Sequence, residues 1–160
     1  MVLIPAVKKA IDIPLIAAGG IATGRQMLAA MVLGAEGVQI GSRYVASEEA
    51  SSHLNFKQAV INSNEGDTVL TLKQLTPVRL IKNDFYKLVQ DAEQKGANQA
   101  ELIQLLGRAR AKKGMFEGNL AEGELEIGQV STLLDTILPA AVITESIWRE
   151  FREALANPIG

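Results

Sequence analysis

Two short stretches decide the fold of this chain: IPLIAAGGI at residues 13–21 and GVQIGSR at residues 37–43. Each is an apolar run that ends in small residues, and a segment of helical length separates them. Strand, helix and strand within about 30 residues form a βαβ unit, whose two strands run parallel. Because a backbone N–H reaches a phosphate oxygen only where no side chain intervenes, glycines at two neighbouring strand ends indicate one shared phosphate site.

The candidate phosphate ligands follow from these strand ends. The amides around Gly19 and Gly20, and those around Gly41 and Ser42, would surround the phosphate. The Ser42 hydroxyl and the N-terminus of a helix that opens near Thr23 would contribute further. In β/α barrels the loops after strands 7 and 8 make such a site. The alternative is that both turns need glycine for backbone reasons alone.

Three other polar residues near these strands have two interpretations each. Gln39 lies in an apolar strand, so it either contacts a bound ligand or is satisfied by neighbouring backbone. Arg43 either approaches the phosphate or forms a salt bridge with Glu36. His53 is the only histidine, and we interpret it as a surface or helix-start residue, because a catalytic base has partners nearby. No spacing of His or acidic residues predicts a metal site.

Two later segments also have alternative roles. The basic stretch at residues 108–113 would bind an acidic partner, such as a phosphopantetheine carrier or the phosphates of a dinucleotide, or would be a solvated face. Its charges are Arg108, Arg110, Lys112 and Lys113. Residues 123–129, GELEIGQ, would close over an active-site mouth or simply connect two elements.

Composition narrows the class of protein. A chain of 160 residues is long enough to bury a sizeable core. Its net charge of −2 gives no reason to expect nucleic acid or a membrane surface as a partner. The chain has no cysteine, so disulfides and a cysteine nucleophile are excluded within it. Without a long apolar run or a signal-peptide pattern at residues 1–5, the expected location is cytoplasmic.

Hydrophobic periodicity predicts alternating elements at the front and mostly helices behind. The helix at Thr23 carries a capping box with Gln26 and ends at Gly34. Strands are expected at residues 13–18, 38–40, 68–72 and 78–81, and helices at 5–10, from 23, at 56–61, 84–94, 99–106, 129–138 and 139–156. Two parallel strands alone do not make a buried sheet, so the chain either borrows strands from copies of itself or is a piece of something larger.

The front of the chain closely resembles a known family. IAAGGIATGR at residues 16–25 and LGAEGVQIGSRY at residues 33–44 are similar to the nitronate monooxygenases, formerly called 2-nitropropane dioxygenases. This family includes the FMN-dependent enoyl-ACP reductase II branch. FKQA at 56–59, TVLT at 68–71 and GELEIGQV at 123–130 resemble its second half. The resemblance covers essentially the whole chain, but only about the C-terminal half of a family member.

The resemblance implies an α/β fold that is the C-terminal part of a TIM (β/α)8 barrel with a mostly helical inserted domain. Residues 14–20 would be barrel strand 7 and residues 37–41 strand 8. The expected division is a barrel fragment with the phosphate-binding ends at 1–47, the inserted domain at 48–124, and helices that return to the barrel at 125–160.

The resemblance also implies FMN as cofactor, with NAD(P)H as the reductant in one branch. The residues that would bind FMN are Gly19 and Gly20 at one strand end and Gln39, Ile40, Gly41 and Ser42 at the other. Ser42 stands where the family usually has threonine, so the hydroxyl is kept. The family's catalytic histidine lies on an earlier strand, upstream of this chain, so no catalytic residue is assigned here. We therefore expect the chain alone to be inactive and to bind FMN weakly or not at all.

The leading hypothesis is a fragment of an FMN-dependent oxidoreductase. Its substrate would be a small molecule such as a nitronate, oxidised with oxygen, or an acyl thioester, reduced with NAD(P)H. One alternative is a barrel of the inosine monophosphate dehydrogenase group, whose cysteine nucleophile would have to lie upstream. Another is a non-enzymatic phosphate-binding or self-assembling module. In each case an exposed strand edge predicts a homo-oligomer.

Overall fold

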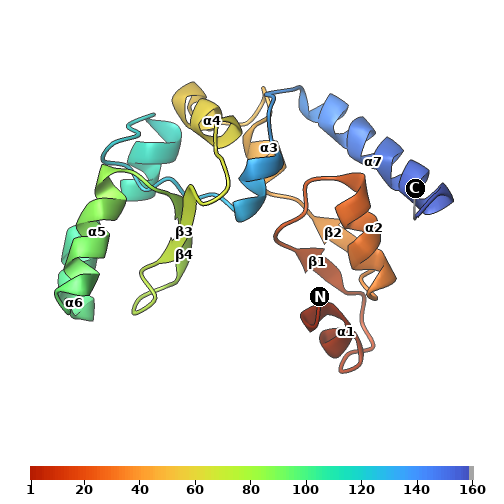
Figure 1. Cartoon of the computed structure of the whole chain (residues 1–160), viewed down its shortest axis with the longest axis horizontal. Coiled ribbons are helices and arrows are strands. Elements are labelled where there is room, and N and C mark those ends of the chain that lie inside the picture. Colours follow the sequence, from red (N-terminus) through yellow and green to blue (C-terminus); the bar gives the residue numbers. More distant parts are fainter. Residues whose placement is uncertain (159–160) are drawn as a thin grey trace.

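The computed structural model describes residues 1–158, which form two lobes joined by short helices into an arch (Figure 1). The first lobe contains α1 (Leu3–Lys8), β1 (Ile16–Ala18), α2 (Gly24–Val32), β2 (Gly37–Gln39) and α7 (Ala140–Ala156). The second contains β3 (Thr68–Thr71), β4 (Val78–Ile81), α5 (Asp84–Gln94) and α6 (Gln99–Leu106). Between them lie α3 (Ser42–Val45), α4 (Leu54–Ile61) and the 3-10 turn η2 (Gln129–Leu133), while the π-helical turn η1 (Lys112–Phe116) belongs to the second lobe.

The predicted βαβ unit is present. Strands β1 and β2 pair in parallel, with Ala17 opposite Val38. The capping box at the start of α2 is also confirmed: the Thr23 side chain accepts from the backbone of Gln26, whose side chain accepts from the backbone of Thr23. At the other end Gly34 takes a φ of +113°, which a residue with a side chain rarely adopts. The sequence therefore sets both ends of this helix.

The first strand is shorter than predicted. The pattern at residues 13–18 indicated a strand buried on both faces, but only Ile16–Ala18 pairs with β2. Ile13 is 67% exposed and Ile16 54% exposed, so that expectation is wrong for this chain. The reason is that β1 has β2 as its one partner strand among residues 1–158, and this side of the sheet lacks a covering layer.

The last helix closes the first lobe by packing along α2 (Figure 1). The contact is so close that a Cβ on Gly24 would lie 2.1 Å from the backbone nitrogen of Phe151. Ile147 and Phe151 are buried from α7, and Trp148 stacks on Phe151 with ring centroids 5.2 Å apart. Only glycine at position 24 permits this approach.

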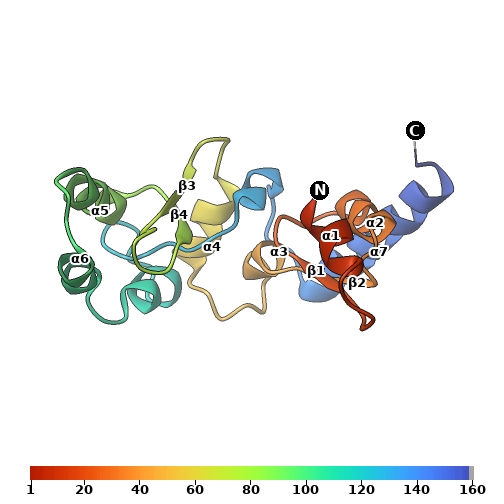
Figure 2. The same ribbon diagram turned by 90° about the horizontal axis from the view of Figure 1, so that it is seen from below.

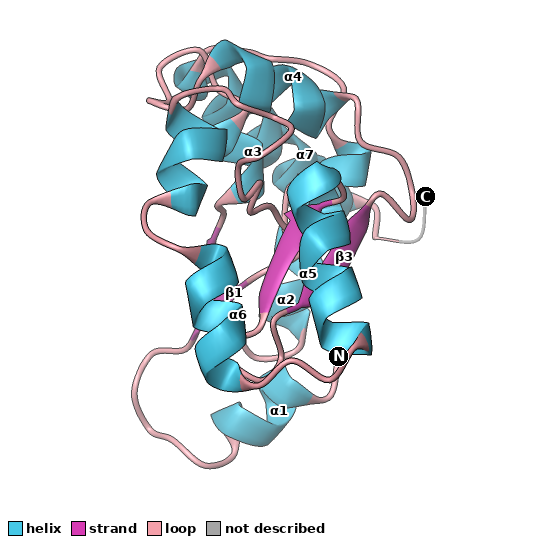
Figure 3. Ribbon diagram, turned by 90° about the vertical axis from the view of Figure 1, so that its left-hand side faces the viewer, coloured by secondary structure: helices cyan, strands magenta, loops and turns pink. Residues whose placement is uncertain are grey.

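The second lobe is a hairpin with two helices packed on it. Strands β3 and β4 are antiparallel, and α5 and α6 lie side by side at the outer end of the lobe (Figure 3). Residues 125–127 run beside β4 as an isolated antiparallel bridge between Leu80 and Glu126. The Ile81 N–H donates to the Leu125 carbonyl at 2.9 Å and the Ile127 N–H to the Arg79 carbonyl at 3.1 Å. The buried core of this lobe consists of Leu72, Phe85, Val89 and Leu102.

A separate core fills the junction between the lobes. Its buried members come from the ends of both lobes and are Ala22, Ala46, Phe56, Val60, Leu125, Ile127, Val130 and Leu134. The helix predicted at residues 129–138 is wrong: only Gln129–Leu133 turns, as a 3-10 helix. The chain then extends, so that Leu138 bridges Ser47 and accepts from the Glu48 N–H at 3.0 Å. Among residues 1–158, no helix is both long and apolar enough to cross a bilayer.

Candidate functional site

The two glycine-ended strands finish at the same edge of the sheet. Ala18 lies opposite Gln39 in the parallel ladder, so Gly19 and Ile40 follow side by side. Figure 2 shows the two strands adjacent, with α2 next to them. The pairing therefore brings together the two sets of residues that the sequence singled out.

The three glycines at this edge differ in backbone conformation. Gly19 and Gly20 have φ angles of +97° and +71°, so their turn needs glycine whether or not a ligand binds. Gly41 has a φ of −103°, which any residue adopts. A Cβ on any of the three would meet nothing within 4 Å. Gly41 thus has no conformational or packing reason to be glycine within this chain.

The hydroxyl of Ser42 is held in place by the segment that leads from the second lobe into η2. The Gly128 N–H donates to Ser42 Oγ at 3.1 Å. A Cβ on Gly128 would lie only 2.8 Å from the same oxygen, so glycine is required for this contact. Since Oγ accepts from Gly128, its own proton stays available to donate to an anion. Residues 123–129 were predicted to be a closing loop or a connector, and nothing in their sequence indicates this contact between Gly128 and Ser42.

Backbone N–H groups at the N-terminus of α2 have partners within the chain. The N–H groups of Ala22 and Thr23 donate to Gln26 Oε1, and the Gln26 N–H donates to Thr23 Oγ1. The Gly24 N–H donates to Glu150 Oε2 at 2.9 Å. A carboxylate already occupies this helix end and would repel a phosphate. These contacts do not favour the prediction that this helix N-terminus contributes to phosphate binding.

The surroundings of Gln39 and Arg43 differ from those predicted. Gln39 is exposed at the end of β2 and is not a buried polar group. Arg43 Nη1 donates to the Thr136 carbonyl at 2.8 Å, and partial burial lowers the pKa of its guanidinium. Glu36 pairs with Lys8 at 2.6 Å, so the predicted alternative of an Arg43–Glu36 salt bridge is wrong. Arg43 anchors the segment that follows η2.

His53 has the structural role that its isolation predicted. Its Nδ1 accepts a hydrogen bond from the Asn55 N–H at 3.1 Å and so caps the start of α4. The ring packs on Gly118, where a Cβ would lie 2.3 Å from Nδ1. A side chain fixed in this way is not placed as a catalytic base.

The basic stretch also forms internal contacts. Lys112 pairs with Glu117 at 3.3 Å, and Lys113 pairs with Glu122. Arg110 lies over the ring of Phe85, and its guanidinium donates to backbone carbonyls at the end of α6 and at Glu122. The structure thus favours the interpretation of this stretch as a structural, partly solvated face.

The remaining groups at the strand edge have a common chemistry. Backbone N–H groups near Gly19, Gly20, Gly41 and Ser42, together with one hydroxyl, can hold a phosphate without a charged side chain. None of these groups transfers protons at neutral pH, so the edge is suited to binding and orientation. The arrangement is of the kind that can bind a phosphorylated molecule.

The chain is similar to known oxidoreductases over most of its length. Residues 1–150 match the sequence profile of the nitronate monooxygenase family. A probable nitronate monooxygenase of Staphylococcus saprophyticus is 34% identical over 157 residues, which are 97% of this chain and 43% of that protein. Among solved structures, FabK of Thermotoga maritima superposes with a TM-score of 0.91 at 37% identity, over 98% of this chain and 50% of FabK.

A nitroalkane oxidase of Streptomyces ansochromogenes superposes with a TM-score of 0.78 at 26% identity, over 96% of this chain and 44% of the oxidase. The α/β fold is thus that of part of these proteins, and the chain spans about half the length of the relatives it matches. The family match selects the flavin-dependent enzymes over the inosine monophosphate dehydrogenase group. The chain belongs to the nitronate monooxygenase family of oxidoreductases.

Proposed function

We propose that the edge formed by Gly19, Gly20, Ile40, Gly41 and Ser42 holds the phosphate of FMN in a flavin-dependent oxidoreductase. Gly41 carries the proposal, because it combines an ordinary φ with open space above its Cα. A glycine that neither the backbone nor the packing requires is explained by close approach of a ligand. Gln39 is exposed beside this space and would donate its amide to the cofactor.

We also propose how the chain sits in the family's barrel. Residues 14–20 and 37–41 would be barrel strands 7 and 8, and residues 1–47 a barrel fragment. The parallel ladder and the uncovered side of β1 support this assignment. Residues 48–124 would be the inserted helical domain and residues 125–160 the return to the barrel. The contact of α7 with α2 supports the latter.

In the proposed reaction this chain binds and orients the cofactor. Bound FMN would supply two-electron transfer, from a nitronate or from NAD(P)H to the second substrate. The amides at both strand ends would fix the phosphate, and Gly128 would aim the Ser42 hydroxyl toward it. The family resemblance puts the catalytic histidine outside this chain. The 160-residue chain alone is therefore proposed to show no oxidase or NAD(P)H turnover.

The test is a titration of the 15N-labelled chain with FMN and, separately, with inorganic phosphate. Both should shift the amide resonances of Gly19, Gly20, Gly41 and Ser42. Gly41→Leu should remove those shifts, because the new side chain fills the open space while the backbone tolerates it. Ala100→Leu, at an exposed position of α6, is the matched control. Shifts centred on residues 108–113, or none at the strand ends, would refute the assignment.

A second candidate function is self-association. Exposed apolar side chains surround the free edge of β1, including Leu3 at 73%, Ile13 at 67% and Ile16 at 54%. A hollow of about 520 Å³ lies between α1, β1 and α2. We propose that copies of the chain pair through this edge. Sedimentation of the same sample decides: oligomers support the pairing, and a monomer at all concentrations contradicts it.

A further inference from the structure

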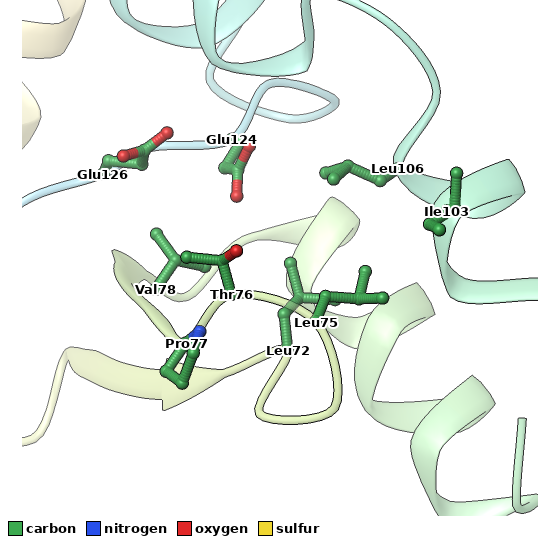
Figure 4. Close-up of a pocket in the computed structure, with 9 residues that line it drawn as sticks. All are labelled: Leu72, Leu75, Thr76, Pro77, Val78, Ile103, Leu106, Glu124 and Glu126. Atoms are coloured by element: carbon green, nitrogen blue, oxygen red, sulfur yellow. The ribbon is translucent and has the colours of Figure 1, made fainter. Parts of the chain in front are cut away.

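The second lobe contains a groove that the proposed FMN site does not use. It has a volume of about 570 Å³ and lies between the β3–β4 turn, α6 and the segment at residues 124–126. Figure 4 shows an apolar floor with two carboxylates above it. The apolar lining consists of Leu72, Leu75, Pro77, Val78, Ile103 and Leu106.

Strand periodicity explains why the carboxylates face this groove. Residues 124–127 alternate, and Leu125 and Ile127 point into the junction core. Glu124 and Glu126 therefore point to the opposite side, where both line the groove. The backbone of this segment is fixed by its hydrogen bonds to Arg79 and Ile81. The two carboxylates are thus held by the sheet and not by a mobile loop.

Glu124 is the unusual member of the pair. Glu124 is only 7% exposed, and Figure 4 shows its carboxylate directed toward the groove. The cation that acts on its carboxylate is Arg110, whose guanidinium donates to the carbonyls of Leu105, Leu106 and Glu122. Within residues 1–158 the Glu124 carboxylate has no hydrogen-bond donor. Burial, followed by repulsion from Glu126, raises the pKa of Glu124.

We propose that this groove binds an aliphatic amine in its protonated form, with the alkyl stem on the apolar floor and the ammonium group against Glu124. Glu124 is largely enclosed, its carboxylate opens on the groove, and no donor within residues 1–158 meets it. An ammonium group would supply both the missing hydrogen bond and the opposite charge. Glu126, exposed at the rim, adds a second negative charge. The volume is in the range of small-ligand sites.

Other ligand classes fit this groove less well. A fatty acid or another anion would place its charge beside two carboxylates. A neutral alkyl group would cover the floor but leave Glu124 buried and unpaired. A protonated amine on a short alkyl stem satisfies both parts of the site.

The test uses three probes with the same stem, namely hexylamine, hexanol and hexanoate, titrated separately into the 15N-labelled full chain at pH 7.5. Hexylammonium should shift the amides of residues 75–78 and 124–126 and bind more tightly than hexanol. Hexanoate should bind most weakly. Glu124→Gln should weaken hexylammonium binding at least about tenfold and leave hexanol binding unchanged. Glu65→Gln, an exposed change of equal charge in a distant turn, should alter neither.

Two outcomes would overturn the proposal. Equal affinity for hexylammonium and hexanol would mean that the groove is only an apolar surface. An absence of shifts in residues 75–78 and 124–126 with any probe would mean that it binds none of them. The glycine amides at the strand ends are an independent readout in the same spectra, so failure of this site and failure of the FMN proposal are distinguishable.

Discussion

The carboxylate of Glu150 accepts a hydrogen bond from the backbone N–H of Gly24 at 2.9 Å, across 126 residues of sequence. The bond joins the last helix to the first turn of α2, where the positive end of the helix dipole favours a negative charge. It fixes α7 on the βαβ unit and also takes the helix end that a phosphate would otherwise use. This leaves the two strand ends as the proposed phosphate ligands.

Because α7 packs so closely on α2 at this bond, position 24 does not tolerate a side chain. Gly24→Ala would place a Cβ 2.1 Å from the Phe151 nitrogen and 2.4 Å from the Ile147 carbonyl, both backbone atoms that cannot rotate away. We expect a loss of about 3 kcal/mol or more in the free energy of unfolding, measured by urea denaturation. Gly41→Ala is the control, because a Cβ at position 41 meets nothing within 4 Å. The free energy of unfolding of this variant should be unchanged. Equal losses would mean that α7 does not pack as described.

The contact between Gly128 and Ser42 predicts a coupled effect on phosphate binding. Ser42→Ala removes the hydroxyl, and Gly128→Ala places a Cβ 2.8 Å from Ser42 Oγ and displaces it. Each change should weaken binding of inorganic phosphate to the chain about fivefold, the effect of one hydrogen bond. The double variant should be no weaker than either single one, because both remove the same interaction. Additive losses would show that Gly128 acts through another route.

The sequence predicted the parts of this fold that depend on local chemistry. The capping box at Thr23, the turn at Gly34 and the glycine ends of β1 and β2 are all encoded within a few residues. The parallel pairing followed because a helix separates two short apolar runs. For the same reason the positions of Gly19 and Gly41 at one edge were predicted.

What the sequence did not predict depends on contacts between distant segments. The helix expected after Gln129 stops at Leu133, because the following residues run beside Ser47 instead. The Glu150 contact with Gly24 joins residues with no shared pattern. The burial of Glu124 depends on the hairpin and α6, which enclose it and lie elsewhere in the sequence. Periodicity describes which face of an element is apolar, but not which distant element covers it.

A buried hydroxyl in the junction core gives a stability prediction of the opposite sign. Ser131 is fully buried, and its Oγ has no hydrogen-bond partner among residues 1–158. Ser131→Ala should therefore raise the free energy of unfolding by about 1 kcal/mol. Ser63→Ala is the matched control, because Ser63 is also buried but donates to the Ala59 carbonyl at 2.8 Å. That control should lose about 1 kcal/mol. Losses in both variants would show that Ser131 has a partner.

The buried carboxylate in the groove predicts how stability changes with pH. Burial raises the pKa of Glu124, so the folded chain binds its proton more tightly than the unfolded chain does. This contribution to stability is fully present below the ordinary glutamate pKa of about 4.3 and is lost as pH rises through the raised value. In Glu124→Gln that decline should disappear, as measured by urea denaturation at intervals from pH 4 to pH 8.

Glu122 is the internal control with the opposite sign. A hydrogen bond from Lys113 lowers the pKa of this exposed carboxyl, so its contribution is present above the ordinary value and is lost as pH falls through the lowered one. Glu122→Gln should therefore affect only the acid side of the stability profile, and only slightly, since solvent screens exposed pairs. If Glu124→Gln behaved in the same way, its carboxylate would be solvated and the groove would lack the unpaired charge that attracts an amine.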